Sequence, residues 1–342
     1  MMRIKKILMV LTAMVCVAVP GKALSFALDS VAEWGKFPRF CVKTYRWGDR
    51  FFNSYDSAYV KGTGYKMNVK LRTNSWIDDN RFLIDHDCKV EMRSPSTNTI
   101  GFDITYLAVS LGYDFNINKL FGGVDRRKSK FNFDFTASLY SIKNDVGMNL
   151  KRVGDMKGIN EKFDGVRTSS WGIEAVYFFN NKRYSYAAAF SISKLQLRSQ
   201  GSFFVGFSYN NQDLNFDFAK LPDYLKPQLP EEWHSRVFTV KEQTCGVKGG
   251  YAYNWVPAKH YNIGVSEAVI PSVSKGKQSS VNPGCSFRLY NRLNLSVTWN
   301  NRRWFAGIVG KTDVAVVADK KTILANSLFS VEMKVGWRFN LW

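Results

Sequence analysis

The stretch that decides the fold is FSVEMKVGWRFNLW, residues 329–342. Every second residue from Phe329 to Leu341 is apolar, and the residues between them are polar, charged or glycine. Successive side chains of a β-strand point to opposite faces of a sheet. This stretch therefore predicts a strand with one apolar face and one polar face, ending on the aromatic residue Trp342.

The same alternation recurs along the rest of the chain. It is clear in 66–74, 131–139 and 287–300, and noisier near 82–93, 99–115, 169–179, 184–194, 201–210, 245–255, 260–270 and 302–312. These segments and the last one predict about twelve strands, with about ten or fourteen as alternatives. Longer polar connections are expected at 116–129, 144–168, 211–244, 271–284 and 313–325.

Strand length and aromatic placement favour a membrane barrel over a soluble sandwich. Strands of sandwiches are usually about five or six residues long, whereas several segments here are longer than about ten. Aromatic residues lie near the ends of the apolar faces, as expected at the two surfaces of a bilayer: Trp76, Trp171, Tyr177, Tyr184, Tyr253, Trp255, Tyr261, Trp299 and Trp337. We predict a closed antiparallel transmembrane β-barrel and keep a secreted soluble β-sandwich as the alternative.

The N-terminus predicts export. A basic start at Arg3 is followed by an apolar stretch from Ile7 to Val19, and small residues then precede a cleavage site, so 1–23 reads as a signal peptide. We expect 24–65 to be a periplasmic lead-in or a segment folded into the barrel mouth, and 66–342 to be the barrel. The cysteines outside the signal peptide are Cys41, Cys88, Cys245 and Cys285. Their spacing predicts no zinc site and leaves their disulfide state open.

Charge points to the barrel interior. The chain has 48 Lys plus Arg against 28 Asp plus Glu, a net charge of +20. The basic residues expected to face the lumen are Lys66, Lys70, Arg72, Lys248, Arg288, Arg292, Lys334 and Arg338. The acidic residues expected there are Asp103, Asp134, Glu174 and Glu332. Two interpretations stay open: a ladder of ion pairs that fills a narrow interior, or a positive lumen that favours anions.

Candidates for catalysis are few. The three histidines are His86, His234 and His260. Adjacent His234 and Ser235 are the candidates for a barrel enzyme that modifies lipid or lipopolysaccharide, but they lie in what reads as a long loop. No glycine-rich phosphate loop and no metal-binding spacing is present. We therefore expect no catalytic residues, no metal and no cofactor, and predict that the chain is not an enzyme.

Several motifs resemble a known family, the domain of unknown function 4421, which occurs in exported proteins of Gram-negative bacteria. The stretches that look alike are WGDRFFNSYD (47–56), YVKGTGYK (59–66), VKLRTNSW (69–76), RSPST (93–97), RSQGSFF (198–204) and GWRFNLW (336–342). The resemblance covers the mature chain and implies an exported barrel. The family has no assigned activity, so it implies no site residues.

The sequence as a whole predicts a porin-like outer-membrane barrel with a structural, narrow transport or binding role. The basic loops at 126–128 and 320–321 would meet the phosphates of lipopolysaccharide, and outer-membrane lipid would surround the strands. Phe339, Leu341 and Trp342 form the terminal strand that a barrel-assembly machinery would recognise. The scattered basic residues match no nucleic-acid-binding module. The oligomeric state is left open.

Overall fold

The computed structural model describes residues 54–340 except 86, 107–108, 118–125, 133–136, 145–147, 277–283 and 319–321, and gives the backbone alone at 106, 109–112, 126–132 and 137–144. The predicted signal peptide, Cys41, His86, Asp134, Lys320, Lys321, Leu341 and Trp342 lie outside the described residues, and so do the side chains of the loop 126–128. Within the described part of the chain, no helix is long and apolar enough to cross a membrane.

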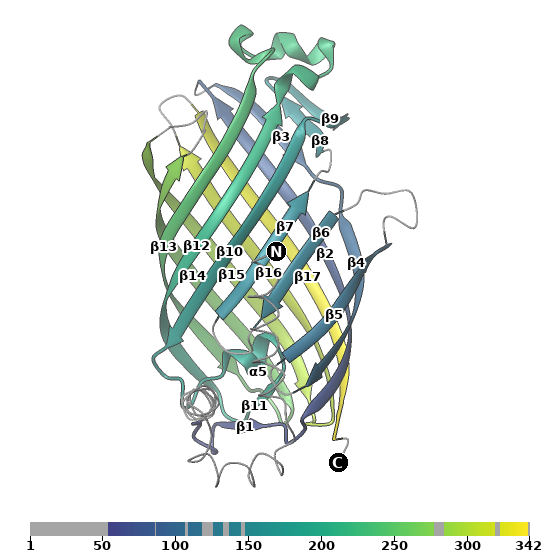
Figure 1. Cartoon of the computed structure of the whole chain (residues 1–342), viewed down its shortest axis with the longest axis vertical. Helices are drawn as coiled ribbons and strands as arrows, with labels where there is room; N and C mark the ends of the chain where they lie inside the picture. Colours follow the sequence, from purple (N-terminus) through teal and green to yellow (C-terminus); the bar gives the residue numbers. More distant parts are fainter. Residues whose placement is uncertain are drawn as a thin grey trace, which may run out of the picture. The chain divides into compact units, whose positions relative to one another are not determined.

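Strands make up most of residues 58–340, and they form one large antiparallel sheet (Figure 1). Its strands are β2 (Met67–Ile84), β3 (Cys88–Arg93), β4 (Thr97–Tyr106), β5 (Val109–Asn116), β6 (Arg126–Asn132), β7 (Ala137–Asn144), β8 (Met148–Val153), β9 (Met156–Phe163), β10 (Val166–Phe178), β12 (Gln200–Asp217), β13 (Val237–Trp255), β14 (Tyr261–Gly276), β15 (Cys285–Asn300), β16 (Trp304–Ala318) and β17 (Thr322–Phe339). This confirms the predicted all-β antiparallel class.

Neighbouring strands of the large sheet are mostly neighbours in sequence. The order is β6-β7-β10-β12-β13-β14-β15-β16-β17-β2, after which one half of β2 pairs with β4 and the other half with β3. β5 follows β4, whereas β8 and β9 follow β3. The last strand pairs with β2 along its whole length, from Thr322 opposite Ile84 to Phe339 opposite Met67. Among the described residues no ladder joins β5 to β6, so the predicted closure is not established by strand pairing.

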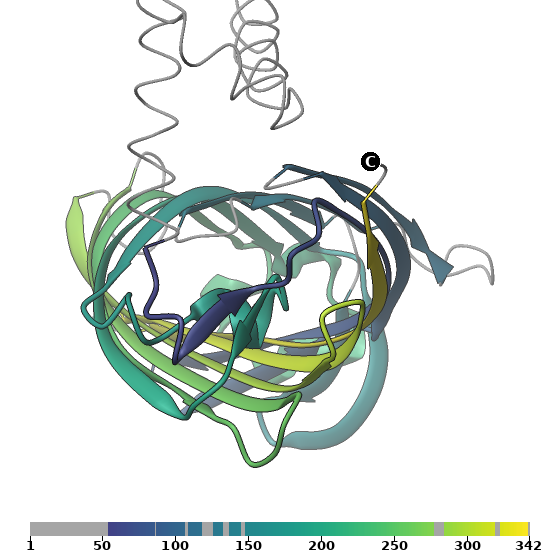
Figure 2. The same cartoon turned by 90° about the horizontal axis from the view of Figure 1, so that it is seen from below.

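Two small elements lie within the curl of the sheet. Seen from below, the sheet curves around β1 (Val60–Gly62), β11 (Lys194–Gln196) and the short helix α5 (Tyr186–Phe190) (Figure 2). β1 and β11 form a separate two-stranded sheet. We call residues 179–199, which connect β10 to β12 and include α5 and β11, the interior segment. The end of the sheet where it lies is called the terminal end, because β17 finishes there.

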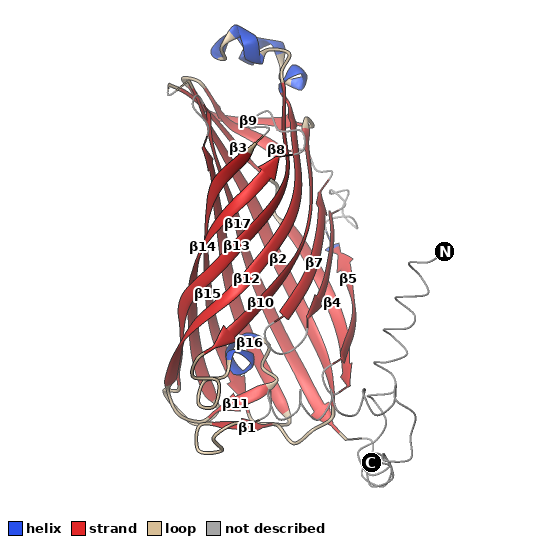
Figure 3. Ribbon diagram, turned by 60° about the vertical axis from the view of Figure 1, so that its left-hand side comes forward, coloured by secondary structure: helices blue, strands red, loops and turns tan. Residues whose placement is uncertain are grey.

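The opposite end, called the loop end, carries the connection between β12 and β13 (Figure 3). This connection contains three short 3-10 helices, Phe218–Lys220, Asp223–Gln228 and Glu231–Trp233. Both flanking strands are long, at 18 and 19 residues. The predicted polar connection at 211–244 is therefore shorter than expected, because strand structure extends into it from both sides.

Other sequence-based expectations are wrong in detail. Residues 184–194, expected to form a strand, contain α5 and lie in the interior segment. The expected connection 144–168 contains β8 and β9. Trp76 and Tyr184 are buried, with 5% and 2% of their surface exposed, and do not lie on the exposed apolar face. The prediction for these two side chains was wrong because an aromatic ring packs as well in a filled interior as on a lipid-facing surface.

The two faces of the sheet are opposite to those of a soluble protein. Large apolar side chains are exposed on β12, β14 and β17, as shown by Phe203, Val265 and Met333. Polar and charged side chains of the same strands are buried, as shown by Ser202, Ser266 and Lys334. The apolar face is therefore outward and the polar face inward, an arrangement that suits a hydrocarbon surround.

This arrangement reverses near the loop end. Along β13, Tyr251 and Val247 are exposed while Lys248 is buried, but further along Phe238 and Val240 are buried and Lys241 is half-buried on the outward face. In β2, Leu71 is exposed, but beyond Asn80 the buried residues are Phe82 and Ile84. A water-exposed sheet has its apolar face inside, so the reversal is what is expected of strands that extend from an apolar surround into water.

Candidate functional site

The candidate site is the interior of the sheet, where charged side chains from distant strands meet. Its centre is Glu174 on β10. Arg292 Nη1 on β15 donates to both Glu174 carboxylate oxygens, at 2.7 and 2.6 Å. Lys248 Nζ on β13 donates to the same carboxylate at 3.2 Å. Three strands separate β10 from β15 in the sheet, so the bond to Arg292 crosses the interior.

Arg292 also contacts a second carboxylate. Its Nε donates to Asp313 Oδ1 on β16, so one guanidinium joins two acids. Guanidinium groups suit this role because their donors are fixed in a planar fork. Glu174, Lys248, Arg292 and Asp313 together are charge-balanced. The positive charge predicted for this part of the interior is therefore neutralised by its neighbours.

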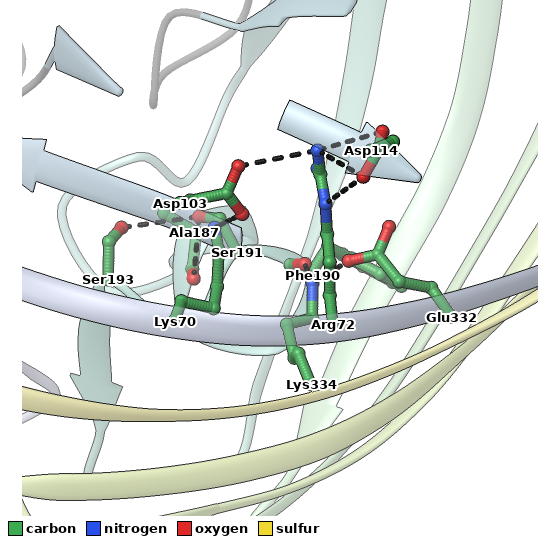
Figure 4. A network of polar contacts seen from close by, with 10 residues as sticks. All are labelled: Lys70, Arg72, Asp103, Asp114, Ala187, Phe190, Ser191, Ser193, Glu332 and Lys334. Carbon is green, nitrogen blue, oxygen red and sulfur yellow. Dashed lines mark hydrogen bonds and ion pairs between the residues drawn. The ribbon is translucent and has the colours of Figure 1, made fainter. Parts of the chain in front are cut away.

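A second group lies on the strands β2, β4 and β5 (Figure 4). Arg72 donates to Asp114 through Nε and Nη2, at 3.1 and 3.0 Å, which is a bidentate contact. Arg72 Nη2 and Lys70 Nζ each lie 3.3 Å from a carboxylate oxygen of Asp103. These contacts place two cations against two buried or half-buried acids, again as a ladder of ion pairs.

A third pair is the most deeply buried. Arg288 on β15 donates through Nε to Glu242 Oε2 on β13 at 3.2 Å, and through Nη2 to Glu242 Oε1. Their side chains are 0% and 3% exposed. Next to this pair, two residues beyond Glu242 along β13, Thr244 shares a hydrogen bond of 2.6 Å with Ser274 between their hydroxyls. Nothing in this layer leaves a charge without a counter-charge.

At the terminal end, cations bind the backbone of the interior segment. Lys334 Nζ donates to the carbonyl of Phe190 at 2.8 Å and also lies 2.7 Å from Glu332 (Figure 4). Arg338 donates through Nη2 to the carbonyl of Ile192. Its Nη1 donates to Asn300 Oδ1 at 2.9 Å and to the carbonyl of Arg302 at 2.6 Å. Two of the basic interior residues therefore bind backbone carbonyls of the interior segment.

Amide side chains hold the interior segment at further points. Asn254 Nδ2 donates to the carbonyl of Ser185 at 2.8 Å, and Asn300 Nδ2 donates to the carbonyl of Lys194 at 3.1 Å. Gln196 Nε2 donates to the carbonyl of Arg183 at 2.7 Å, which ties the two ends of the segment together. These bonds satisfy backbone groups that would otherwise be buried without partners.

The segment also packs against the wall through small residues. Ala187, Ala188 and Ala189 are buried, and Gly264 on β14 faces Ala189 so closely that a Cβ built on the glycine would lie 2.5 Å from the Ala189 Cβ. A Cβ on Gly307 would lie 2.7 Å from Ile192 Cδ1. The interior segment therefore packs closely against the sheet.

Burial raises the pKa of Tyr186, in the same segment, to about 12, so its hydroxyl stays neutral.

The loop end of the interior is closed by apolar packing. Phe82, Phe216 and Phe238 form edge-to-face contacts, with ring centroids 4.9 and 5.2 Å from Phe82. Trp233, from the last 3-10 helix, is 1% exposed and packs 5.1 Å from Phe218. Leu150 and Val153 of β8 belong to the same cluster. The interior therefore has three layers: apolar at the loop end, ion pairs in the middle, and the interior segment at the terminal end.

The residues predicted to face the lumen are placed as follows. Seven of the eight basic residues contact the interior groups described above; Lys66 precedes β2 and is exposed. Phe339 ends β17. Three acidic partners were missing from the prediction: Asp114, Glu242 and Asp313. Continuing the alternation of 245–255 backwards would have placed Glu242 on the face of Lys248 and Thr244.

The described histidines make no catalytic arrangement. His234 Nε2 lies 3.1 Å from the carbonyl of Leu229, and Ser235 is exposed. His260 Nδ1 lies 3.1 Å from the carbonyl of Asn300, in the turn before β14. Cys88, Cys245 and Cys285 are free thiols. Among the residues that the structure describes, no three His, Cys, Asp or Glu side chains are grouped to hold a metal ion.

Solved structures with a related arrangement include outer-membrane proteins. The outer membrane protease OmpT from Escherichia coli matches with 6% identity and a TM-score of 0.37, over 80% of this chain and 96% of that one. The toluene transporter TodX from P. putida matches with 9% identity and a TM-score of 0.25, over 81% and 91%. The translocator domain of the autotransporter NalP from Neisseria meningitidis matches with 11% identity and a TM-score of 0.27, over 89% and 97%.

These comparisons correct one prediction. The prediction that the chain is not an enzyme is wrong, because a barrel architecture does not exclude catalysis: a protease is among the similar structures. The likeness is too distant to assign a reaction to this chain, and no curated protein is significantly similar to it in sequence. The family resemblance, in contrast, is confirmed. A family model matches residues 54–339, and the chain belongs to the family described as domain of unknown function (DUF4421).

Proposed function

We propose that this chain is an outer-membrane β-barrel whose interior is closed at rest by the interior segment. The observation that carries the proposal is the reversed distribution of side chains, with exposed apolar rows outside and buried ion pairs inside. A sandwich would need those apolar rows packed against each other. The barrel would have twelve strands, in the order β6, β7, β10, β12, β13, β14, β15, β16, β17, β2, β4 and β5, and would close between β5 and β6. Closure would pair edges that lipid cannot hydrate.

The proposed role is gated passage or binding of a small polar solute. Ion pairs and hydrogen bonds fill the middle and the terminal end, so an open path requires the interior segment to move. The bonds from Lys334 and Arg338 to the carbonyls of Phe190 and Ile192 are among the contacts that such a movement must break. Lipopolysaccharide and the barrel-assembly machinery remain predicted partners, and export by the signal peptide remains a prediction.

Conductance across planar bilayers tests the gating. The wild-type protein is expected to give no steady current, because the interior is filled. Arg338→Met removes the guanidinium that binds Ile192, Asn300 and Arg302, so discrete openings are expected to appear. Arg303→Gln is the control, because Arg303 stacks over Trp337 at 5.8 Å on the outward side. Steady wild-type current, or a silent Arg338→Met whose interior segment has become accessible to protease, would contradict gated passage.

A further inference from the structure

One charged side chain lies where the rest of the outward surface is apolar. The outward residues of β14 are Tyr261, Ile263, Val265, Glu267, Val269, Pro271, Val273 and, nearest the loop end, Lys275. Glu267 has three uncharged, largely apolar residues on each side before Lys275 is reached. Apart from Lys275, it is the only acidic or basic side chain among the described outward residues between the terminal-end aromatics and the reversal near the loop end. It therefore lies at the centre of the apolar band.

Glu267 is paired with a second polar residue on the same surface. Asn291 on β15 donates through Nδ2 to Glu267 Oε1 at 3.2 Å. Asn291 likewise interrupts an apolar row, between Leu289 and Leu293. The contact uses one amide hydrogen and one carboxylate oxygen. The second amide hydrogen and the second carboxylate oxygen have no hydrogen-bond partner among the described residues, and lipid tails would offer them neither donor nor acceptor.

Two glycines lie on the outward surface near this pair. Gly249 on β13 lies opposite Val269, and Gly310 on β16 lies opposite Leu295. A Cβ built on either glycine would meet no atom within 4 Å, so both positions leave open space. Small residues on a membrane-facing surface allow two backbones to approach closely. The glycines therefore flank the polar pair with room for another surface.

We infer that this patch, formed by Gly249, Glu267, Asn291 and Gly310, is the contact between two copies of this chain. The inference rests on the proposed insertion into a membrane. The pair is self-complementary, because each copy presents one spare amide donor and one spare carboxylate acceptor. Two copies inserted in the same direction hold these groups at the same depth. A two-fold contact lets Asn291 of each copy donate to Glu267 of the other.

The test compares dimer formation by the full chain in lipid vesicles, counted by single-molecule photobleaching. Folding and insertion are checked separately by heat-dependent gel mobility, so failed insertion is not mistaken for failed pairing. The wild type is expected to show two-step bleaching. The variant E267L/N291L is expected to dimerise at least about 10-fold more weakly, because it removes both donor and acceptor. Gly249→Trp tests the same surface through bulk alone and is expected to give monomers.

A matched control exists on another part of the outward surface. Ser75 on β2 donates to Asn98 on β4 at 2.6 Å, so S75L/N98L also removes an outward hydrogen-bonded pair. This control is expected to dimerise like the wild type. A wild type that inserts but stays monomeric would overturn the inference. Equal dimerisation of folded E267L/N291L, or assemblies larger than two, would overturn it as well.

Discussion

Most buried charged side chains of the interior lie next to a side chain of opposite charge. A charge removed from water is costly unless a partner of opposite sign and further hydrogen bonds replace the lost hydration. Arg288 and Glu242 meet this condition, although Arg288 Nη1 has no partner among the described residues. Arg292 meets it with two acids. Each cation of this kind depends on a particular acid, so the loss of one member harms the fold more than the loss of both.

The Arg288–Glu242 pair gives a prediction about stability. Arg288→Met is expected to lower the free energy of unfolding by about 3–5 kcal/mol, because it leaves the Glu242 carboxylate buried without a counter-charge. R288M/E242L is expected to recover most of this loss, because no charge then remains buried. Urea unfolding in lipid vesicles measures both. Asp223→Asn, which breaks the exposed pair with Lys226, serves as the unchanged control. A single variant as stable as the wild type would refute this dependence.

At the scale of elements, each long strand serves two environments. In β12, Phe203 and Phe207 face outward, but beyond Asp213 the buried residues are Leu214 and Phe216. Along one continuous strand the apolar side chains change from the outward to the inward face, as expected if one part lies against lipid and the other in water. The interior segment follows a different rule. It is positioned by fit against Gly264 and Gly307, and by cations that bind its carbonyls.

The fit at Gly264 predicts the effect of added bulk. Gly264→Val would overlap Ala189, and overpacking of this kind costs about 1–3 kcal/mol. The interior segment should then detach more often. Cleavage by trypsin after Lys194, which is buried in the native fold, is expected to rise about 5- to 150-fold, since cleavage follows the detached population. Mass spectrometry of the fragments measures it. Gly284→Val, at an open position, should cleave like the wild type.

At the scale of the whole described unit, the sheet reverses the usual arrangement of polar and apolar surface. The outer surface is apolar between the terminal end and the reversal. The interior holds ion pairs, the interior segment and the apolar cluster at the loop end. A free lumen is not needed for this fold to be stable, because its polar groups satisfy one another. The proposed passage of a solute therefore depends on whether one of the three interior layers can move.

Quenching of tryptophan fluorescence by lipids with brominated chains tests the orientation of the sheet. Trp304 is 50% exposed on the outward face and is expected to be strongly quenched in a variant that retains it as the only tryptophan. Trp76 is 5% exposed and faces the interior, so its single-tryptophan variant should be quenched only weakly. Equal quenching of the two would mean that the apolar rows do not face lipid.

The sequence alone determined the all-β class and the two-faced strands, because alternation is a local property that backbone geometry converts directly into faces. It also indicated most of the basic interior residues. It missed Glu242, because at the loop end the apolar rows move to the other face and the pattern there looks like a loop. It also misassigned 184–194, where short apolar residues suit a strand as well as a packed interior.

Only the tertiary structure decided which charges meet. The bond from Arg292 to Glu174 joins residues 118 positions apart, across strands that are not neighbours. Such a contact depends on the curvature of the sheet and on the depth of each strand, which no local pattern encodes. The same holds for Lys334 and Arg338, whose partners are carbonyl oxygens. Every residue carries a carbonyl oxygen, so composition cannot reveal that these two cations hold the interior segment in place.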